Sequence, residues 1–349
     1  MSKYYTRACN FYFGTLSKEK VKKKLSIPIH SNNLISFDTI EIISRKSSKR
    51  INIKEIGLLK GFIKKKILFD IKQISKKKLF NGLKFTNSPI LMGVLNLTPN
   101  SFSDGGKYLK KDLGVKHAKK LISDGCGILD LGGEATNPGS KKVDEDEEWK
   151  KISPTLLKIK KFKKFISLDT RKSTIMAKGI KNKINLINDV SGLEYDPNTI
   201  KLLKNTRIPF VIHHIQGEPE TMQKNPKYNN VVLDIYDFFE KKIKFIRSNG
   251  IKHNNIILDP GIGFGKNLKH NITLLRNISI FHSLGFPVML GTSRKRFIKD
   301  LSGANDSKER LGGTISSSLF AIMQGVQILR VHDVNELKQS IKVFNSLKF

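Results

Sequence analysis

Polar residues follow each of eight short apolar runs in the later three-quarters of this chain, and this pattern constrains its fold more than any other feature. The runs, each with the residues that follow it, are Leu91–Leu95 before Asn96, Ile128–Leu131 before Gly132–Glu134, Phe165–Leu168 before Asp169, Leu186–Ile187 before Asn188–Asp189, Pro209–Ile212 before His213–His214, Ile256–Leu258 before Asp259, Pro287–Leu290 before Gly291–Lys295, and Ile328–Leu329 before Arg330–Asp333. A (β/α)8 barrel keeps its active site at the carboxyl ends of its parallel strands. The pattern therefore predicts an enzyme.

Amphipathic helices are predicted between these strands. The clearest is Val231–Asn249, whose apolar residues recur with a period of about 3.6 and which Gly250 follows as a C-terminal cap. A second is Lys116–Asp124, ended by Gly125. Alternating strands and helices indicate the α/β class with a parallel sheet. We predict a TIM barrel over residues 87–349, and an open doubly wound sheet is the structural alternative.

Residues 1–86 differ from the rest in composition, with 21 Lys and Arg against 5 Asp and Glu. Short β-like pieces lie among clusters of lysine, at Ile40–Ile43, Ile51–Ile53 and Ile67–Phe69. These features predict a small basic α+β N-terminal extension, and they leave open how tightly it folds. Pro89 favours an extended approach to the first barrel strand, so we place the boundary just before it, between residues 86 and 87.

The formal net charge of +34 is extreme. Lysine, isoleucine and asparagine are abundant along the whole chain, as an AT-rich coding sequence would produce, so the charge does not by itself indicate a nucleic-acid partner. It does favour anionic substrates. No apolar run reaches the roughly 18–20 residues of a membrane helix, and no secretory signal is evident. The two cysteines, Cys9 and Cys126, have neither CxxC nor metal-ligand spacing, which fits a reduced, cytoplasmic setting.

Two loops at the predicted active face are long or rich in glycine. Residues 96–106 are longer than the usual two to six residues of a βα turn, which is typical of a lid or binding loop, although the same residue types also build plain turns. The second loop, residues 132–140, begins with paired glycines that allow a ligand close to the backbone, and Thr136 offers a hydroxyl there. A tight structural turn is the alternative for the second loop.

Acidic and amide side chains are predicted to converge on one pocket. Asp169, Asn188 and Asp259 each end a strand, and together they suit a flat heterocycle with an amino–amide edge, because carboxylates accept its N–H groups and an amide both donates and accepts. Each could instead cap the helix that follows it. Residues 259–266 are glycine-rich but lack the spacing of a P-loop, so we predict close approach to a ring, with Phe264 as the stacking face.

An anion site is predicted from the last two strands. Ser293, Arg294 and Lys295 begin a helix after strand seven, where barrels often bind phosphate, although a solvated basic turn is the alternative. Arg330 and His332 lie two residues apart on strand eight, so their side chains share one side and favour an anion clamp. For the adjacent pair His213–His214 we predict no metal role, because no partner lies at ligand spacing.

Taken together, these motifs resemble those of the dihydropteroate synthase family. The resemblance runs from about Ile90 to the C-terminus, roughly three-quarters of the chain. It rests on the ordered set 92–99 (MGVLNLTP), 101–106 (SFSDGG), 214–217 (HIQG) with Pro219 and Met222–Gln223, 259–266 (DPGIGFGK), 293–295 (SRK) and 330–333 (RVHD).

The resemblance implies a transferase of folate biosynthesis that joins (7,8-dihydropterin-6-yl)methyl diphosphate to 4-aminobenzoate and releases diphosphate. It implies that Asp169, Asn188, Asp259 and Lys295 hold the pterin. Asn96, Arg330 and His332 would hold the diphosphate, with Asn96 also binding Mg²⁺, the one cofactor we expect. Ser293 and Thr136 would lie near the second substrate. Asp104 would stabilise positive charge on the pterin methylene, and catalysis would use no covalent enzyme intermediate. Family members are usually homodimers.

Two positions depart from the family pattern. Asn100 stands where the first loop usually has Asp, and Asn137 stands where the second loop usually has an Arg that helps to close the loops. Lys141 and Lys142 are near enough to substitute for that Arg. Two other functions remain as alternatives. One is a pterin-binding methyltransferase, which would not need the anion set and would use a cobalamin region that is not evident. The other is an RNA-binding module built on the extension, although the extension lacks an aromatic-rich RNA motif.

Overall fold

The computed structural model describes residues 3–86, 88–97, 113–136 and 139–348. Eight parallel strands follow one another around a ring: β5 (Ile90–Asn96), β6 (Ile128–Gly132), β7 (Phe165–Asp169), β8 (Leu186–Asp189), β9 (Phe210–His213), β10 (Ile256–Asp259), β11 (Met289–Leu290) and β12 (Ile328–Val331). The ladder runs from β10 through β5 to β12 and β11. A parallel bridge between Leu258 and Val288 then joins β10 to β11 and closes the barrel. The predicted barrel is confirmed, and the open sheet is wrong.

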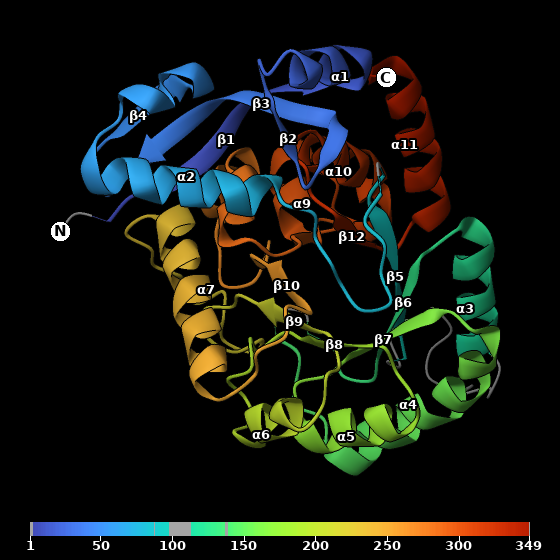
Figure 1. The fold of residues 1–349 in the computed structure, drawn as a ribbon. Helices are drawn as coiled ribbons and strands as arrows, with labels where there is room; N and C mark the ends of the chain where they lie inside the picture. The colour runs from blue at the N-terminus through green and yellow to red at the C-terminus, as the bar shows by residue number, and fades with distance from the viewer. Residues whose placement is uncertain (1–2, 87, 98–112, 137–138, 349) are drawn as a thin grey trace.

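Helices alternate with the strands and surround the barrel (Figure 1). They are α3 (Leu113–Asp124), α4 (Glu145–Ile159), α5 (Ser173–Lys181), α6 (Asn198–Lys204), α7 (Val231–Ser248), α8 (Leu268–Arg276), α9 (Arg296–Ser302), α10 (Leu311–Met323) and α11 (Val334–Lys348), with 3-10 helices η3 (Lys160–Phe162), η4 (Ile278–Leu284) and η5 (Ser307–Arg310). The helix predicted at 231–249 is α7. Its N-terminus is capped by the Asn230 side chain, which accepts hydrogen bonds from the backbone N–H groups of Val232 and Leu233.

The N-terminal extension is folded around a core of its own. It contains β1 (Tyr5–Phe13), α1 (Gly14–Lys22), β2 (Ile27–Ile29), β3 (Asn32–Ile43), β4 (Ser48–Asn52), η1 (Ile53–Leu58) and α2 (Gly61–Ser75). Both β1 and β4 pair with β3 in antiparallel register, and so does β2. The predicted strand Ile67–Phe69 is wrong, because these residues lie in α2. Ile67, Ile71 and Ile74 recur at helical spacing and are buried against the sheet.

The extension docks against the barrel at η4, which packs against β1 and α2, and at α7. The ring of Tyr5 packs edge-on against that of Tyr236, with ring centroids 5.1 Å apart. The backbone carbonyl of Ala8 in β1 accepts a hydrogen bond from the Ser279 hydroxyl, 3.0 Å away. Lys3 also pairs with Asp237 of α7, so aromatic, backbone and charged contacts all cross this junction and give the extension a defined position on the barrel.

The segment between α2 and β5 passes across the amino-terminal end of the barrel (Figure 1). Its Phe80 and Leu83 form a short antiparallel bridge. Leu83 is buried, and Phe80 and Phe85 pack beside it against a layer of barrel side chains, which comprises Met92, Ile128, Leu186, Val211, Ile257, Met289 and Ile328. The segment therefore fills the end of the barrel opposite the carboxyl ends of the strands. The domain boundary between residues 86 and 87 stays a prediction.

Within the part of the chain that the structure describes, no helix is long and apolar enough to cross a membrane.

Candidate active site

A pocket opens at the carboxyl ends of the barrel strands and collects most of the site residues that the sequence predicts. Its lining comes from the ends of seven strands, β6 to β12, or from the loops that follow them: Thr136, Asp169, Asn188, Val190, His213, Asp259, Ile262, Phe264, Gly291, Lys295 and Arg330. Asp169, Asn188 and Asp259 are all buried there. The barrel therefore brings together side chains that are far apart in sequence, and we call this space the barrel pocket.

Asp259 ends β10 and faces the barrel pocket with one strong backbone contact. Its Oδ1 accepts a hydrogen bond of 2.8 Å from the backbone N–H of Gly261. Gly261 has a φ of +69° and approaches the carbonyl of His214 so closely that a Cβ there would lie 1.9 Å from that oxygen, so only glycine fits. Burial raises the pKa of Asp259 to about 6. A ligand that donates N–H groups to this buried carboxylate would stabilise its charged form.

Arg330 is held between two carboxylates inside the barrel. Its Nε donates to Asp130 and its Nη2 donates to Asp169, each over 2.7 Å. The same Asp130 oxygen accepts a hydrogen bond from the Asn188 amide, 3.1 Å away. In this state the Arg330 guanidinium is paired with protein carboxylates, and the anion clamp predicted for Arg330 with His332 stays a prediction. An anionic ligand would have to share the Arg330 guanidinium with Asp130 and Asp169.

Asp130 is a site residue that our sequence reasoning missed. It lies in the middle of β6, is fully buried, and orients both Arg330 and Asn188. Its second oxygen, Oδ1, has no hydrogen-bond partner among the described residues. The signal was present in the sequence, since a carboxylate inside an otherwise apolar strand is costly to bury and indicates a functional partner.

Lys295 faces Phe264 across the wall of the barrel pocket. Its ammonium lies 4.0 Å from the centre of the Phe264 ring, in cation–π geometry. Burial, followed by repulsion from Arg330, lowers the pKa of Lys295 to about 8, while Asp259 acts in the opposite direction. The predicted stacking face of Phe264 therefore carries a cation at its surface, and the two residues together can contact a flat, electron-rich ring.

Ser293 and His332 contact each other at the edge of the site. The Ser293 hydroxyl lies 2.9 Å from Nδ1 of His332, and neither residue lines the cavities described here. Burial and the neighbouring Arg330 lower the pKa of His332 to about 3, so this imidazole is neutral at pH 7. Arg294, the residue after Ser293, has a φ of +59°. Its guanidinium forms a bidentate ion pair with Asp333, the residue after His332. This ion pair, which the sequence did not reveal, holds the turn that presents Ser293 and Lys295.

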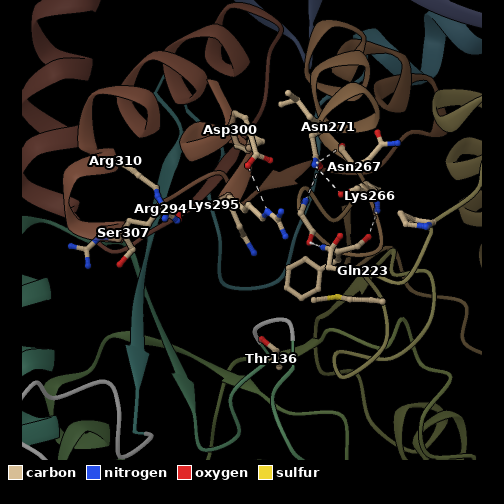
Figure 2. A pocket seen from close by; sticks show the side chains of 17 residues that line it. Thr136, Gln223, Lys266, Asn267, Asn271, Arg294, Lys295, Asp300, Ser307 and Arg310 are labelled. Atoms are coloured by element: carbon tan, nitrogen blue, oxygen red, sulfur yellow. Dashed lines mark hydrogen bonds and ion pairs between the residues drawn. The ribbon is translucent and has the colours of Figure 1, made fainter. Parts of the chain in front are cut away.

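A larger cavity of about 430 Å³, drawn in Figure 2, shares lining residues with the barrel pocket. It shares Thr136, Phe264 and Lys295 with the barrel pocket and has as its other lining residues Met222, Gln223, Pro226, Gly263, Lys266, Asn267, Leu268, Asn271, Arg294, Arg296, Phe297, Asp300, Ser307 and Arg310. Thr136 lies across the cavity from Lys295 and Gln223 (Figure 2). We call this space the outer cavity.

Lys266 is a second residue that the sequence did not single out. Its buried ammonium lies 3.0 Å from Nδ1 of His214 and donates to the carbonyl of Phe264 over 2.8 Å. Burial lowers the pKa of Lys266 well below its usual value. Lys266 thereby ties the end of β9 to the glycine-rich loop. The neighbouring His213 lines the barrel pocket, and its Nδ1 lies 3.1 Å from the carbonyl of Val190.

The base of the second loop is fixed by a buried ion-pair network. Glu134 accepts two hydrogen bonds from Arg171 and one from the backbone N–H of Val143, so a single carboxylate joins both ends of the loop. Lys142 pairs with Glu218, with their charged atoms 3.0 Å apart, and Lys141 is exposed. Neither lysine lines the pocket or cavity. Asn100, Asp104 and Asn137 lie outside the described residues.

Comparison with known proteins agrees with this geometry. Residues 92–332 match the family model described as "Pterin binding enzyme". The dihydropteroate synthase of Escherichia coli K12 is 40% identical over 256 residues, which are 73% of this chain and 90% of that protein. That of Bacillus subtilis is 37% identical over 268 residues, or 76% and 91% of the two chains.

Solved structures of the same family superpose on the barrel. The dihydropteroate synthase of Yersinia pestis, in complex with a sulfonamide drug, aligns with a TM-score of 0.72 and 36% identity, over 77% of this chain and 98% of that chain. The enzyme of Thermus thermophilus, in complex with 4-aminobenzoate, aligns with a TM-score of 0.67 and 36% identity, over 74% and 95% of the two chains.

The closed barrel and its acidic, amide-lined pocket thus define a pterin-binding enzyme of the TIM-barrel class. Within this class the chain belongs to the dihydropteroate synthase family. Its activity is that of the family, a transferase reaction of folate biosynthesis. The matched region begins at residue 92, so the N-terminal extension lies outside the family model.

Proposed function

We propose that the chain joins (7,8-dihydropterin-6-yl)methyl diphosphate to 4-aminobenzoate with the pterin in the barrel pocket and the arylamine in the outer cavity. The observation that carries this placement is that the two spaces adjoin and share Thr136, Phe264 and Lys295. Two substrates that bind on either side of these residues would meet there. Asp259 and Asn188 would accept and donate hydrogen bonds along the amino–amide edge of the pterin, and Asp169 would lie beside them.

The leaving diphosphate would be stabilised by positive charge at the barrel mouth. The amine nitrogen attacks the methylene carbon, the carbon–oxygen bond to diphosphate breaks, and the amine proton passes to solvent. Arg330 and Lys295 would contact the departing anion, and His332 would donate or accept a hydrogen bond as a neutral imidazole. These groups act mainly on charge that develops in the transition state.

A Mg²⁺ ion fits this site only if the substrate supplies most of its ligands. Among the described residues, no group of three or more His, Cys, Asp and Glu side chains could hold a metal. The Asn96 carboxamide oxygen lies at the end of β5 beside Gly132, where an added Cβ would sit 3.5 Å from it. Mg²⁺ commonly binds through one or two protein oxygens together with substrate phosphates. Asn96 would hold the ion, which when bound would neutralise charge on the diphosphate.

No covalent intermediate with the enzyme is needed. The arylamine is neutral at pH 7 and is itself the nucleophile, and diphosphate is a good leaving group once its charge is balanced. We propose that the enzyme acts by positioning and electrostatics. The sequence-derived role of Asp104, stabilising positive charge on the pterin methylene, belongs to the same proposal.

We further propose that the enzyme works as a cytoplasmic homodimer. Two neighbouring helices expose large apolar side chains that a second copy of the chain would cover: Phe320 (44% exposed) and Met323 (38%) on α10, and Val343 (61%) on α11. Exposed apolar side chains that cluster on one face are typical of protein interfaces. Sedimentation velocity should give the mass of a dimer, and a monomer at micromolar concentration would reject this assembly.

The experiment that tests the reaction is formation of dihydropteroate by the purified protein, with and without Mg²⁺. We expect product that depends on both substrates and falls when Mg²⁺ is chelated. Asp259→Asn should weaken binding of the pterin diphosphate by about 10- to 100-fold in calorimetry, because a charge-assisted hydrogen bond is worth about 1.5–3 kcal/mol. Normal affinity in this variant would remove Asp259 from the pterin site.

A further inference from the structure

We propose that the N-terminal extension positions one wall of the outer cavity, through an ion pair between Arg45 of the extension and Asp234 of α7. The wall is formed by residues 214–230, which connect β9 to α7 and which we call the pocket loop. The proposal rests on the placement of the arylamine substrate in the outer cavity. It assigns the extension a part in the reaction, although the extension lies outside the family model.

The pocket loop forms the cavity wall through side chains that are themselves tied to the glycine-rich loop. Met222, Gln223 and Pro226 line the outer cavity. The Gln223 amide donates to the carbonyl of Gly263 over 2.7 Å, and the Tyr228 hydroxyl donates to the carbonyl of Gly265 over 2.8 Å. A shift of the pocket loop would therefore also move the glycine-rich loop, which carries Phe264.

Asp234 fixes the end of this loop where it enters α7. Its Oδ2 accepts hydrogen bonds from the backbone N–H groups of Asn229 and Asn230, at 2.9 and 3.1 Å. Its Oδ1 accepts a hydrogen bond of 2.8 Å from Nη1 of Arg45. The two oxygens of one carboxylate thus join the pocket loop to the extension, and Asp234 stands in the first turn of its helix, where a negative charge is favourable.

Arg45 reaches α7 from the turn between β3 and β4. Its Nη2 also donates to Asp237 over 2.6 Å, so one guanidinium bridges two carboxylates that lie three residues apart on the helix. The turn is held by the Ser44 hydroxyl, which accepts hydrogen bonds from the backbone N–H groups of Lys46 and Ser47. β3 belongs to the same sheet as β1, which is docked on η4. Arg45 is therefore presented by a body with a fixed position on the barrel.

Without Arg45, Asp234 would lose the ion pair that joins it to the extension, whereas Asp237 would keep its ion pair with Lys3. Asp234 would then hold the pocket loop less firmly, because its Oδ1 would no longer be fixed by the extension. The barrel pocket is lined by strand ends and the loops after them and includes no residue of the pocket loop, so the pterin site should change little. The expected signature is a weaker interaction with the arylamine at a nearly constant affinity for the pterin diphosphate.

The test compares Arg45→Met with Lys3→Met. Lys3 makes ion pairs from the same extension to Asp237 and Glu240 of the same helix but has none with Asp234, so it is a matched control. We expect Arg45→Met to raise the KM for 4-aminobenzoate by about three- to fivefold, the factor that a partly exposed ion pair contributes. The KM for the pterin diphosphate should stay within about twofold in both variants.

A second measurement needs no substrate. Amide hydrogen exchange should be faster in residues 214–230 of Arg45→Met than in the same residues of wild type and Lys3→Met, with unchanged exchange in β5 to β12. Equal exchange in the two variants would overturn the proposal. Faster exchange with an unchanged KM for 4-aminobenzoate would overturn the role in catalysis. If wild type forms no dihydropteroate, the proposed reaction fails, and the exchange result still reports on the pocket loop independently.

Discussion

Single residues in the barrel pocket are set so that opposite charges coexist at neutral pH. Asp259 has a pKa raised to about 6 by burial, and Lys295 has a pKa lowered to about 8 by burial. Between these values the acid is mostly ionised and the lysine is mostly protonated. This is the state that suits a ligand with N–H donors at one end and a diphosphate at the other.

The pH profile of kcat/KM for the pterin diphosphate should reflect these two groups. As pH falls through about 6, Asp259 takes up a proton and loses its acceptor charge. As pH rises through about 8, Lys295 loses its proton and its attraction for the diphosphate. We expect a bell-shaped profile in the free enzyme, measured from pH 5 to 9 in buffers of constant ionic strength. A profile that is flat over this range would contradict the assignment.

Asp130 should matter although it does not line the cavities. Asp130→Asn keeps the shape of the side chain but removes the charge that Arg330 faces, and it replaces one acceptor oxygen with a donor. We expect kcat/KM to fall by about 10- to 100-fold, the range of a hydrogen bond to a charged group. Circular dichroism should show that the barrel is retained. Activity near that of wild type would mean that Arg330 does not depend on Asp130.

At the scale of elements, periodicity was enough to predict the barrel but not the contacts between its loops. Each of the eight strands carries a short apolar run with a polar end, so its position could be predicted within a few residues. The run Ile67–Phe69 was too short to distinguish a strand from a helix. The Arg330–Asp130 pair joins residues 200 positions apart, so only the closed barrel brings them together.

The segment that fills the amino-terminal end of the barrel should contribute strongly to stability. Leu83 is 9% exposed and packs against the barrel layer, whereas Leu79, four residues earlier, is 76% exposed. We expect Leu83→Ala to lower the free energy of unfolding by about 2–4 kcal/mol. Leu79→Ala, the control, should change it by less than about 0.5 kcal/mol. Urea denaturation of both variants measures the difference, and equal effects would mean that the segment is not a structural part of the barrel.

At the scale of the whole molecule, the extension and the barrel meet at two histidines, the half-buried His30 and the buried His282. Residue His30 lies in the turn between β2 and β3, and its ring packs edge-on against that of His282 in η4, with centroids 4.6 Å apart. One nitrogen of His282 lies 2.8 Å from the carbonyl of Gln324, and the other has no partner among the described residues. No carboxylate is among the groups that shift the pKa of either ring, and the nearby charge is that of Lys78. The junction therefore favours neutral imidazoles.

Acid should weaken this junction in a way that one variant can isolate. Burial lowers the pKa of His282 from 6.5 to about 4. Above pH 6.5 the His282 ring is neutral in both the folded and the unfolded chain, and its contribution to stability is fully present. As pH falls towards 4, this contribution is lost, because the unfolded chain binds a proton at His282 that the folded chain does not. At pH 5 this loss amounts to about 2 kcal/mol. His282→Gln can still donate to Gln324, so the free energy of unfolding of this variant, measured in urea, should fall less between pH 7 and 5 by about that amount. If the free energy of unfolding falls equally in both proteins, acid acts elsewhere in the molecule. The expected difference would place a pH-dependent contact at the junction between the extension and the barrel.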